Sequence, residues 1–131
     1  MTHKTLFPAV VVLVLVLAAC GGPAPQTADV AGQWAGTWTS DEIEAGGSLE
    51  ATFAQTGNEI SGTVTIDGSP CLATGTITGS VSSSNVTFGA VSGPDGIEFS
   101  GTVGATSMNG TYSVESGLCA GDTGTFTAER Q

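Results

Sequence analysis

"SGTVTIDGSPCLATGTITGSV", residues 61–81, contains the unit Gly-Thr-apolar-Thr twice, starting at Gly62 and at Gly75, with a cysteine between the copies. Units of this kind, some with Gly or Ser in the last place, recur along the chain, and they begin at Gly36, Gly62, Gly75, Gly101, Gly110 and Gly124. Each of the two widest intervals also contains one less regular segment, 49–55 and 85–91. The repeat therefore predicts eight β-strands with a nearly even spacing.

Every predicted strand alternates apolar and polar residues in the same phase. The apolar positions are Trp34, Trp38, Leu49, Phe53, Ile60, Val64, Ile66, Ile77, Val81, Val86, Phe88, Ile97, Phe99, Val103, Met108, Tyr112, Val114 and Phe126. Threonine is the commonest residue at the intervening positions, and it suits an exposed strand face. A period of two with one apolar face indicates antiparallel strands that are wet on one side. The repeated glycines fall on the apolar face, where they leave room for neighbouring side chains and for sharp strand coiling.

Turn signals rich in Gly, Pro, Asn, Asp and Ser separate the strands, and no long segment after residue 29 has a helical period. We therefore expect an all-β fold, an eight-stranded antiparallel up-and-down β-barrel over residues 30–131 that closes by pairing the first strand with the last. A β-sandwich is the alternative. Asn109-Gly110 is a hairpin signal, but it fits the repeat and is assigned to the seventh strand.

The first twenty residues have the features of an export signal. A weakly basic start is followed by an apolar run, Leu6–Ala19, which is short for a membrane span. The run ends in Leu17-Ala18-Ala19-Cys20-Gly21, which resembles the lipobox of bacterial lipoproteins. That resemblance implies cleavage before Cys20, attachment of lipid (diacylglycerol, palmitate) to Cys20, and a location on the exported side of the cell membrane or the outer membrane. An ordinary secretory signal is the alternative.

The resulting domain organisation is a signal peptide at 1–19, a Pro/Ala-rich tether at 20–29 that carries the lipidated Cys20, and the barrel at 30–131. The whole chain has a net charge of −10. Removal of residues 1–19 leaves Arg130 as the only basic side chain and leaves no histidine. This charge disfavours nucleic acid and anionic lipid headgroups as partners.

Two cysteines, Cys71 and Cys119, lie in the predicted barrel. In an exported, oxidising setting they are expected to form a disulfide; two free thiols or a metal pair are the alternatives. In an up-and-down barrel the loops after the first, third, fifth and seventh strands share one end, so both cysteines lie at that end. The bond then requires the two loops to fold over the mouth, and Leu72 and Leu118 are expected to plug it.

Val30-Ala31-Gly32-Gln33-Trp34, followed by Gly36 and Trp38, resembles the Gly-x-Trp opening of the lipocalins and avidins, whose barrels are known as calycins. The resemblance implies that the first-strand tryptophan packs near a basic residue of the last strand, and Arg130 occupies the matching place. It also raises the possibility of a small hydrophobic ligand inside the barrel, lined by Trp34, Trp38 and Tyr112. The plainer interpretation makes these aromatic residues part of the core.

Catalysis finds little support in the residues. With no His or Lys after residue 19, Ser-His and Ser-Lys arrangements are excluded, and we expect no catalytic residues and no cofactor. The acids of the loops that share an end with the two cysteines, among them Asp41, Glu42 and Glu44, are expected to be solvated rather than to form an acid–base pair or a calcium site. No metal site is expected.

The sequence thus favours a lipid-anchored envelope lipoprotein whose barrel is a monomeric structural or interaction module with a protein partner. A lipocalin-like binder of a small hydrophobic ligand is the alternative. An internal cavity of a few hundred Å³ would favour the binder, and a filled barrel would favour the module.

Overall fold

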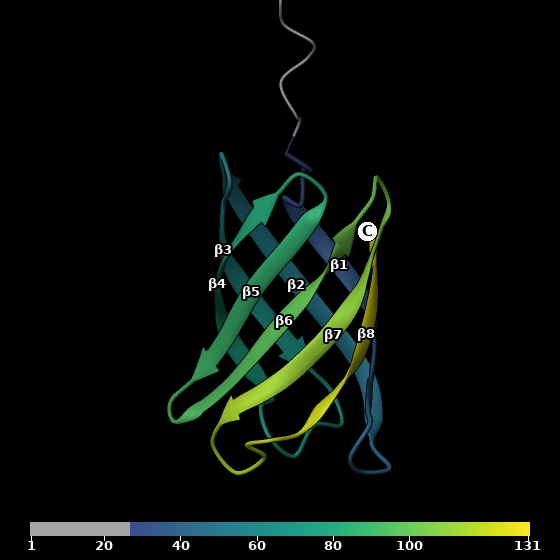
Figure 1. Ribbon diagram of the computed structural model, residues 1–131, viewed down its shortest axis with the longest axis vertical. Helices are drawn as coiled ribbons and strands as arrows, with labels where there is room; N and C mark the ends of the chain where they lie inside the picture. The colour runs from purple at the N-terminus through teal and green to yellow at the C-terminus, as the bar shows by residue number, and fades with distance from the viewer. Residues whose placement is uncertain (1–26) are drawn as a thin grey trace, which may run out of the picture.

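Eight strands follow one another around a closed antiparallel sheet (Figure 1). The computed structural model describes residues 27–131, so the predicted signal peptide 1–19 and Cys20 lie outside the described residues. The strands are β1 (Gly32–Ser40), β2 (Gly46–Thr56), β3 (Glu59–Ile66), β4 (Thr74–Ser82), β5 (Asn85–Ser92), β6 (Asp95–Val103), β7 (Ser107–Ser116) and β8 (Thr123–Arg130). Strand β1 closes the barrel by pairing with β8, with Trp34 opposite Arg130. The predicted up-and-down barrel is confirmed, and the sandwich alternative is wrong.

The two least regular segments are strands, as predicted: they form most of β2 and nearly all of β5. Asn109 pairs with Thr102 on one side and Thr127 on the other, which places Asn109-Gly110 inside β7 rather than in a turn. Asn109-Gly110 does not form a turn because, as part of a strand, these residues keep the alternation of inward and outward side chains in register with both neighbouring strands. Within residues 27–131 the structure contains no helix with the length and hydropathy needed to cross a bilayer.

The alternation predicted from the sequence defines the core. Every large apolar residue predicted to face inward is at most 6 % exposed. Five further residues complete the buried set, and they are Val30, Ala51, Leu72, Ala90 and Ala128. Burial of an apolar side chain of this size stabilises the fold by about 1.5–3 kcal/mol relative to leaving it in water. The interior is therefore the main source of stability.

The inward-facing glycines allow the strands to approach one another closely. At Gly36 a β-carbon would overlap the carbonyl oxygen of Thr127 in β8, and at Gly110 it would overlap that of Ser100 in β6. Gly110 also lies directly opposite Gly101. A side chain at either position would push neighbouring backbones apart, so these two glycines are a requirement of the narrow barrel.

The two ends of the barrel differ in what they contain. We call one the terminal end, because residues 27–31 and the end of β8 lie there, together with the loops β2–β3, β4–β5 and β6–β7 (Figure 1). The other, the lid end, carries the loops β1–β2, β3–β4, β5–β6 and β7–β8. This division of the loops is the one predicted from strand order.

The chain preceding β1 closes the terminal end. Val30 is fully buried, and its backbone N–H donates to Oε1 of Gln55 at 2.8 Å. The N–H of Ala28 donates to the carbonyl of Ser83 in the β4–β5 turn at 2.8 Å, and the Thr27 hydroxyl donates to Asn58 in the β2–β3 turn. The chain therefore enters the barrel by crossing its end and filling it with an apolar side chain.

Candidate functional site

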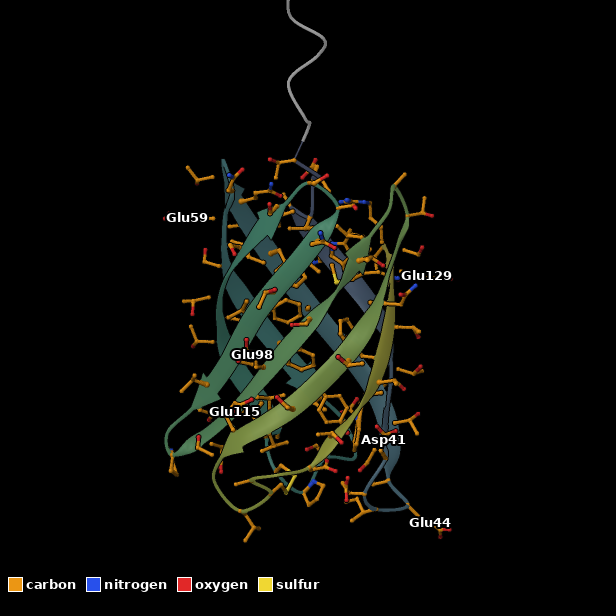
Figure 2. The ribbon with its side chains drawn as sticks, viewed as in Figure 1. Asp41, Glu44, Glu59, Glu98, Glu115 and Glu129 are labelled. Carbon is orange, nitrogen blue, oxygen red and sulfur yellow. A yellow bond between two sulfur atoms is a disulfide. The ribbon has the colours of Figure 1, made fainter. Side chains whose placement is uncertain are left out.

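A disulfide between Cys71 and Cys119 joins the β3–β4 loop to the β7–β8 loop, with 5.5 Å between the two α-carbons. These loops belong to opposite sides of an eight-stranded barrel, so the bond crosses the mouth of the lid end. Figure 2 shows the sulfur–sulfur bond at the end of the barrel away from the termini. The predicted disulfide and the predicted crossing of the mouth are both confirmed.

The two leucines beside these cysteines behave differently. Leu72 is 3 % exposed and packs in the core as predicted, whereas Leu118 is 86 % exposed. The backbone N–H groups of Cys71 and Leu72 both donate to Oγ of Ser69, at 3.1 and 3.2 Å, and this turn directs Leu72 inward. The prediction that Leu118 also plugs the mouth is wrong.

The β7–β8 loop has its own reason to direct Leu118 outward. Gly117 has a φ of +94°, in the left-handed region, and the N–H of Ala120 donates back to its carbonyl at 3.3 Å. The N–H of Gly121 donates to the carbonyl of Val114 at 2.9 Å. This tight turn brings Cys119 to its partner and leaves the preceding side chain on the solvent side.

A polar cluster lies beneath the lid. The Ser40 hydroxyl donates to Asp122 at 2.6 Å and accepts from the backbone N–H groups of Glu42 and Ile43, both at 3.2 Å. The Tyr112 hydroxyl donates to the other carboxylate oxygen of Asp122 at 3.4 Å. Asp122 thereby links β1, β7 and the β7–β8 loop at a partly buried point. Ser40 was not among the predicted site residues, although a serine followed by a turn is a common signal for hydrogen bonds from the backbone to the side chain.

Burial raises the pKa of the Tyr112 phenol to about 12, and the nearby negative charge of Asp122 adds to the effect. Both causes act in the same direction because each disfavours the phenolate. Tyr112 is the chain's only tyrosine, so a change in ultraviolet absorbance from phenolate formation can be assigned to this residue.

The free energy of unfolding is expected to fall between about pH 10 and pH 12. An unfolded chain releases the phenolic proton near pH 10, whereas the folded protein retains it until about pH 12. The folded state therefore binds more protons in this window, and stability is full below it and decreases across it. Urea unfolding of the wild type and of Tyr112→Phe across this window tests the expectation. An equal decrease in both proteins would contradict it.

The three aromatic residues predicted as ligand-lining do not meet at one site. Trp38 and Tyr112 pack edge to face beneath the lid, with ring centroids 6.2 Å apart, and Trp38 Nε1 donates to the carbonyl of Asp67 at 3.0 Å. Trp34 lies at the terminal end, where its Nε1 donates to the carbonyl of Val30 at 2.9 Å. The structure thus brings two of the three together and separates the third.

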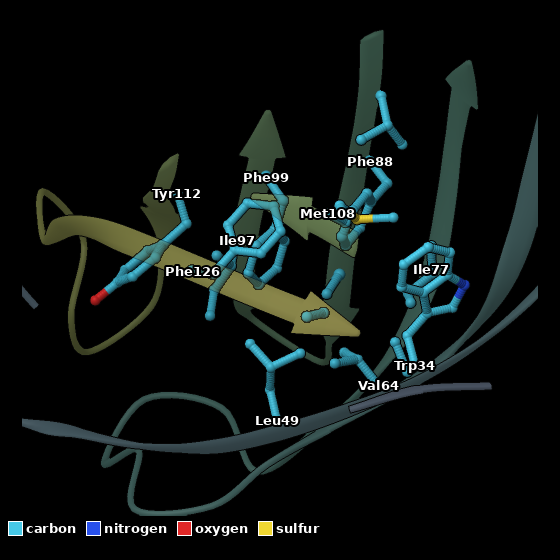
Figure 3. Packing of buried hydrophobic residues seen from close by; sticks show 14 of the residues in the cluster. Trp34, Leu49, Val64, Ile77, Phe88, Ile97, Phe99, Met108, Tyr112 and Phe126 are labelled. Carbon is cyan, nitrogen blue, oxygen red and sulfur yellow. The ribbon is translucent and has the colours of Figure 1, made fainter. Parts of the chain in front are cut away.

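Aromatic rings fill the middle of the barrel (Figure 3). Phe88 stacks on Phe99 with centroids 4.8 Å apart, and Phe53 and Phe126 meet this pair edge to face at 5.1 and 5.3 Å. A void beside Trp38 and Tyr112 measures about 20 Å³, and another among the phenylalanines measures about 10 Å³. Spaces of this size hold about one water molecule, whereas ligand sites measure about 300–1,000 Å³.

Arg130 covers Trp34 from the terminal end, with the guanidinium carbon 4.6 Å from the ring centroid. The same guanidinium group donates to the backbone carbonyls of Asp29, Ala31 (2.7 Å) and Ala105 (3.2 Å). It therefore joins the chain before β1, the β6–β7 turn and the last strand. This is the tryptophan–basic-residue arrangement that the resemblance to calycins implies.

The fold and this pairing are consistent with a calycin-like barrel. No protein-family model matches the chain, and a search of curated proteins finds no match either. The class of fold is thus an eight-stranded up-and-down barrel that is filled, closed at one end by Val30 and at the other by a disulfide-bonded lid.

Acidic residues gather at the lid end. Seven of the chain's twelve are in or beside its four loops, and they are Asp41, Glu42, Glu44, Asp67, Asp95, Glu115 and Asp122. Figure 2 shows Asp41 and Glu44 there, and Glu59 and Glu129 toward the terminal end. No group of three or more side chains with metal-binding geometry occurs in residues 27–131. The lid end is the candidate functional surface because the interior voids are too small to hold a ligand.

Proposed function

We propose that this protein is a lipid-anchored lipoprotein of the bacterial cell envelope, and that its barrel is a non-catalytic interaction module that presents the lid end to a protein partner. The observation that carries the proposal is the filled interior. Without space inside the barrel, recognition falls to its outer surface, and the outer surface is most distinctive at the lid.

The positions of the two barrel ends support an orientation in which the lid end faces away from the membrane. Thr27 lies at the terminal end, seven positions along the chain from Cys20. An extended chain spans at most about 3.6 Å per residue, so a lipid on Cys20 would hold the terminal end within about 25 Å of its attachment point. The acidic lid end would then point away from the membrane, where negative charge is not repelled by headgroups.

The alternative function, binding of a small hydrophobic molecule inside the barrel, has less support. Trp38 and Tyr112 border a void of about 20 Å³, and a ligand would have to displace core side chains to enter. Native mass spectrometry of the purified protein separates the two functions, because a co-purifying small molecule would favour the binder.

Lipid anchoring is tested by metabolic labelling with a fatty-acid probe followed by membrane fractionation. The wild type is expected to carry label and to sediment with membranes, because two or three acyl chains give stable attachment. Cys20→Ala is expected to lose the label and to be released from the membranes. The matched control is the double variant Cys71→Ala, Cys119→Ala, which should remain labelled. An unlabelled, non-sedimenting wild type would overturn the proposal.

A further inference from the structure

We propose that the lid end docks a cationic segment of another protein, one in which an apolar side chain is flanked by lysine or arginine, and that Leu118 is the apolar anchor on this side. The inference deepens the proposed function by naming the chemistry of the partner. It rests on that function only for the orientation of the lid, since the docking surface itself is a property of the folded barrel.

The first observation is the position of the large apolar residues that are exposed. Within residues 27–131 they are Ile43, Val91 and Leu118, which are 48, 53 and 86 % exposed. All three lie at the lid end: Ile43 in the β1–β2 loop, Val91 near the lid-end terminus of β5 and Leu118 in the β7–β8 loop. On the rest of the barrel wall, threonine is the commonest outward-facing residue. An apolar centre surrounded by a polar, charged rim is typical of a protein-binding surface.

The second step is the fixed position of Leu118. The disulfide at Cys119 and the turn hydrogen bonds at Gly117 and Gly121 hold the loop that carries it. A loop with this many constraints loses little conformational entropy on binding, and such preorganisation increases affinity. The fold thus holds an apolar side chain in water with its backbone already ordered.

The third step is charge. Within residues 27–131 the carboxylates of Asp41, Glu42 and Glu44, which flank Ile43, accept no hydrogen bond, in contrast to those of Asp67 and Asp122, which accept from Ser48 and Ser40. The only cation of this part of the chain, Arg130, lies at the terminal end. A strongly negative surface attracts a positive partner and repels a negative one.

The same charge decides between possible occupants. A second copy of this chain would bring another acidic lid against the first, and a bilayer with anionic headgroups would also be repelled. A cationic protein segment is the occupant that matches both the apolar anchor and the acidic surroundings.

A selection from phage-displayed random peptides on the full-length lipidated protein, held in nanodiscs of neutral lipid, tests the proposal. Enriched peptides are expected to carry an apolar residue between basic ones, and to bind more weakly as salt is raised. Leu118→Ser is expected to weaken the best peptide by about tenfold. The change should leave the circular dichroism spectrum unaltered, because the side chain is exposed. Glu59→Gln, at the terminal end, is the matched control and should bind like the wild type.

The inference is overturned if enriched peptides lack basic residues, if no peptide is enriched, or if Leu118→Ser binds as the wild type does. Repeating the binding measurement with Cys20→Ala separates this outcome from that of the proposed function. Binding that survives the loss of lipid supports the docking surface, whatever the membrane fractionation shows.

Discussion

Replacing both Cys71 and Cys119 with alanine is expected to lower the free energy of unfolding by about 4 kcal/mol. The disulfide closes a loop with a sequence separation of 48, and in the chain-entropy account such a cross-link restricts the unfolded chain by about that amount. A second effect acts on the folded protein, since the β3–β4 and β7–β8 loops lose the covalent link that holds them over the mouth. Urea unfolding of the variant and the wild type, followed by circular dichroism, measures the difference.

Reduction of the wild type provides an independent control for the cysteine substitutions. A thiol reductant should lower stability by the same amount as the double variant and should leave the stability of that variant unchanged. Equal stability of oxidised and reduced wild type would show that the cross-link does not stabilise this barrel.

Trp34→Ala is expected to destabilise the protein by about 3–5 kcal/mol, the usual cost of removing a large aromatic side chain from a core. Trp34 is 1 % exposed, and its ring supports Arg130 by a cation–π contact while its N–H satisfies the carbonyl of Val30. The substitution leaves a cavity and removes both contacts at the terminal end. Thermal and urea unfolding give the change in stability.

Two further variants serve as controls for Trp34→Ala. Leu118→Ala removes a side chain that is almost entirely in water, so its effect should stay within about 0.5 kcal/mol. Trp34→Phe retains most of the volume and is expected to be folded even if the alanine variant is not. A cost for Trp34→Ala below about 1 kcal/mol would mean that the terminal end does not depend on this residue.

The fold was predictable from the sequence because the same pattern of residues recurs in most of the strands. Threonine on one face, an apolar residue on the other and an inward glycine recur in strand after strand, so an irregular segment such as 85–91 could be assigned from its neighbours. The parity of the loops then followed from strand order alone. It placed Cys71 and Cys119 at one end, and the structure confirms both the end and the bond.

The details of the lid could not be predicted in the same way. Leu72 and Leu118 both neighbour a cysteine, and their different fates depend on the local turns around Ser69 and Gly117, which no repeat encodes. The role of Ser40 depends on a partner in another loop, Asp122. Whether the centre is filled depends on how side chains from all the strands interdigitate, and an alternation pattern does not contain that information.

Arg130 is one of only two basic side chains in the chain, and this scarcity affects how the protein can be detected by proteolysis. Trypsin cleaves after lysine and arginine, and the chain offers it only Lys4, inside the predicted signal peptide, and Arg130, next to the last residue. If the predicted signal peptide is removed, digestion would therefore yield a fragment that spans the whole barrel. Detection of the barrel by peptide mapping therefore requires an enzyme that cleaves at acidic or aromatic residues.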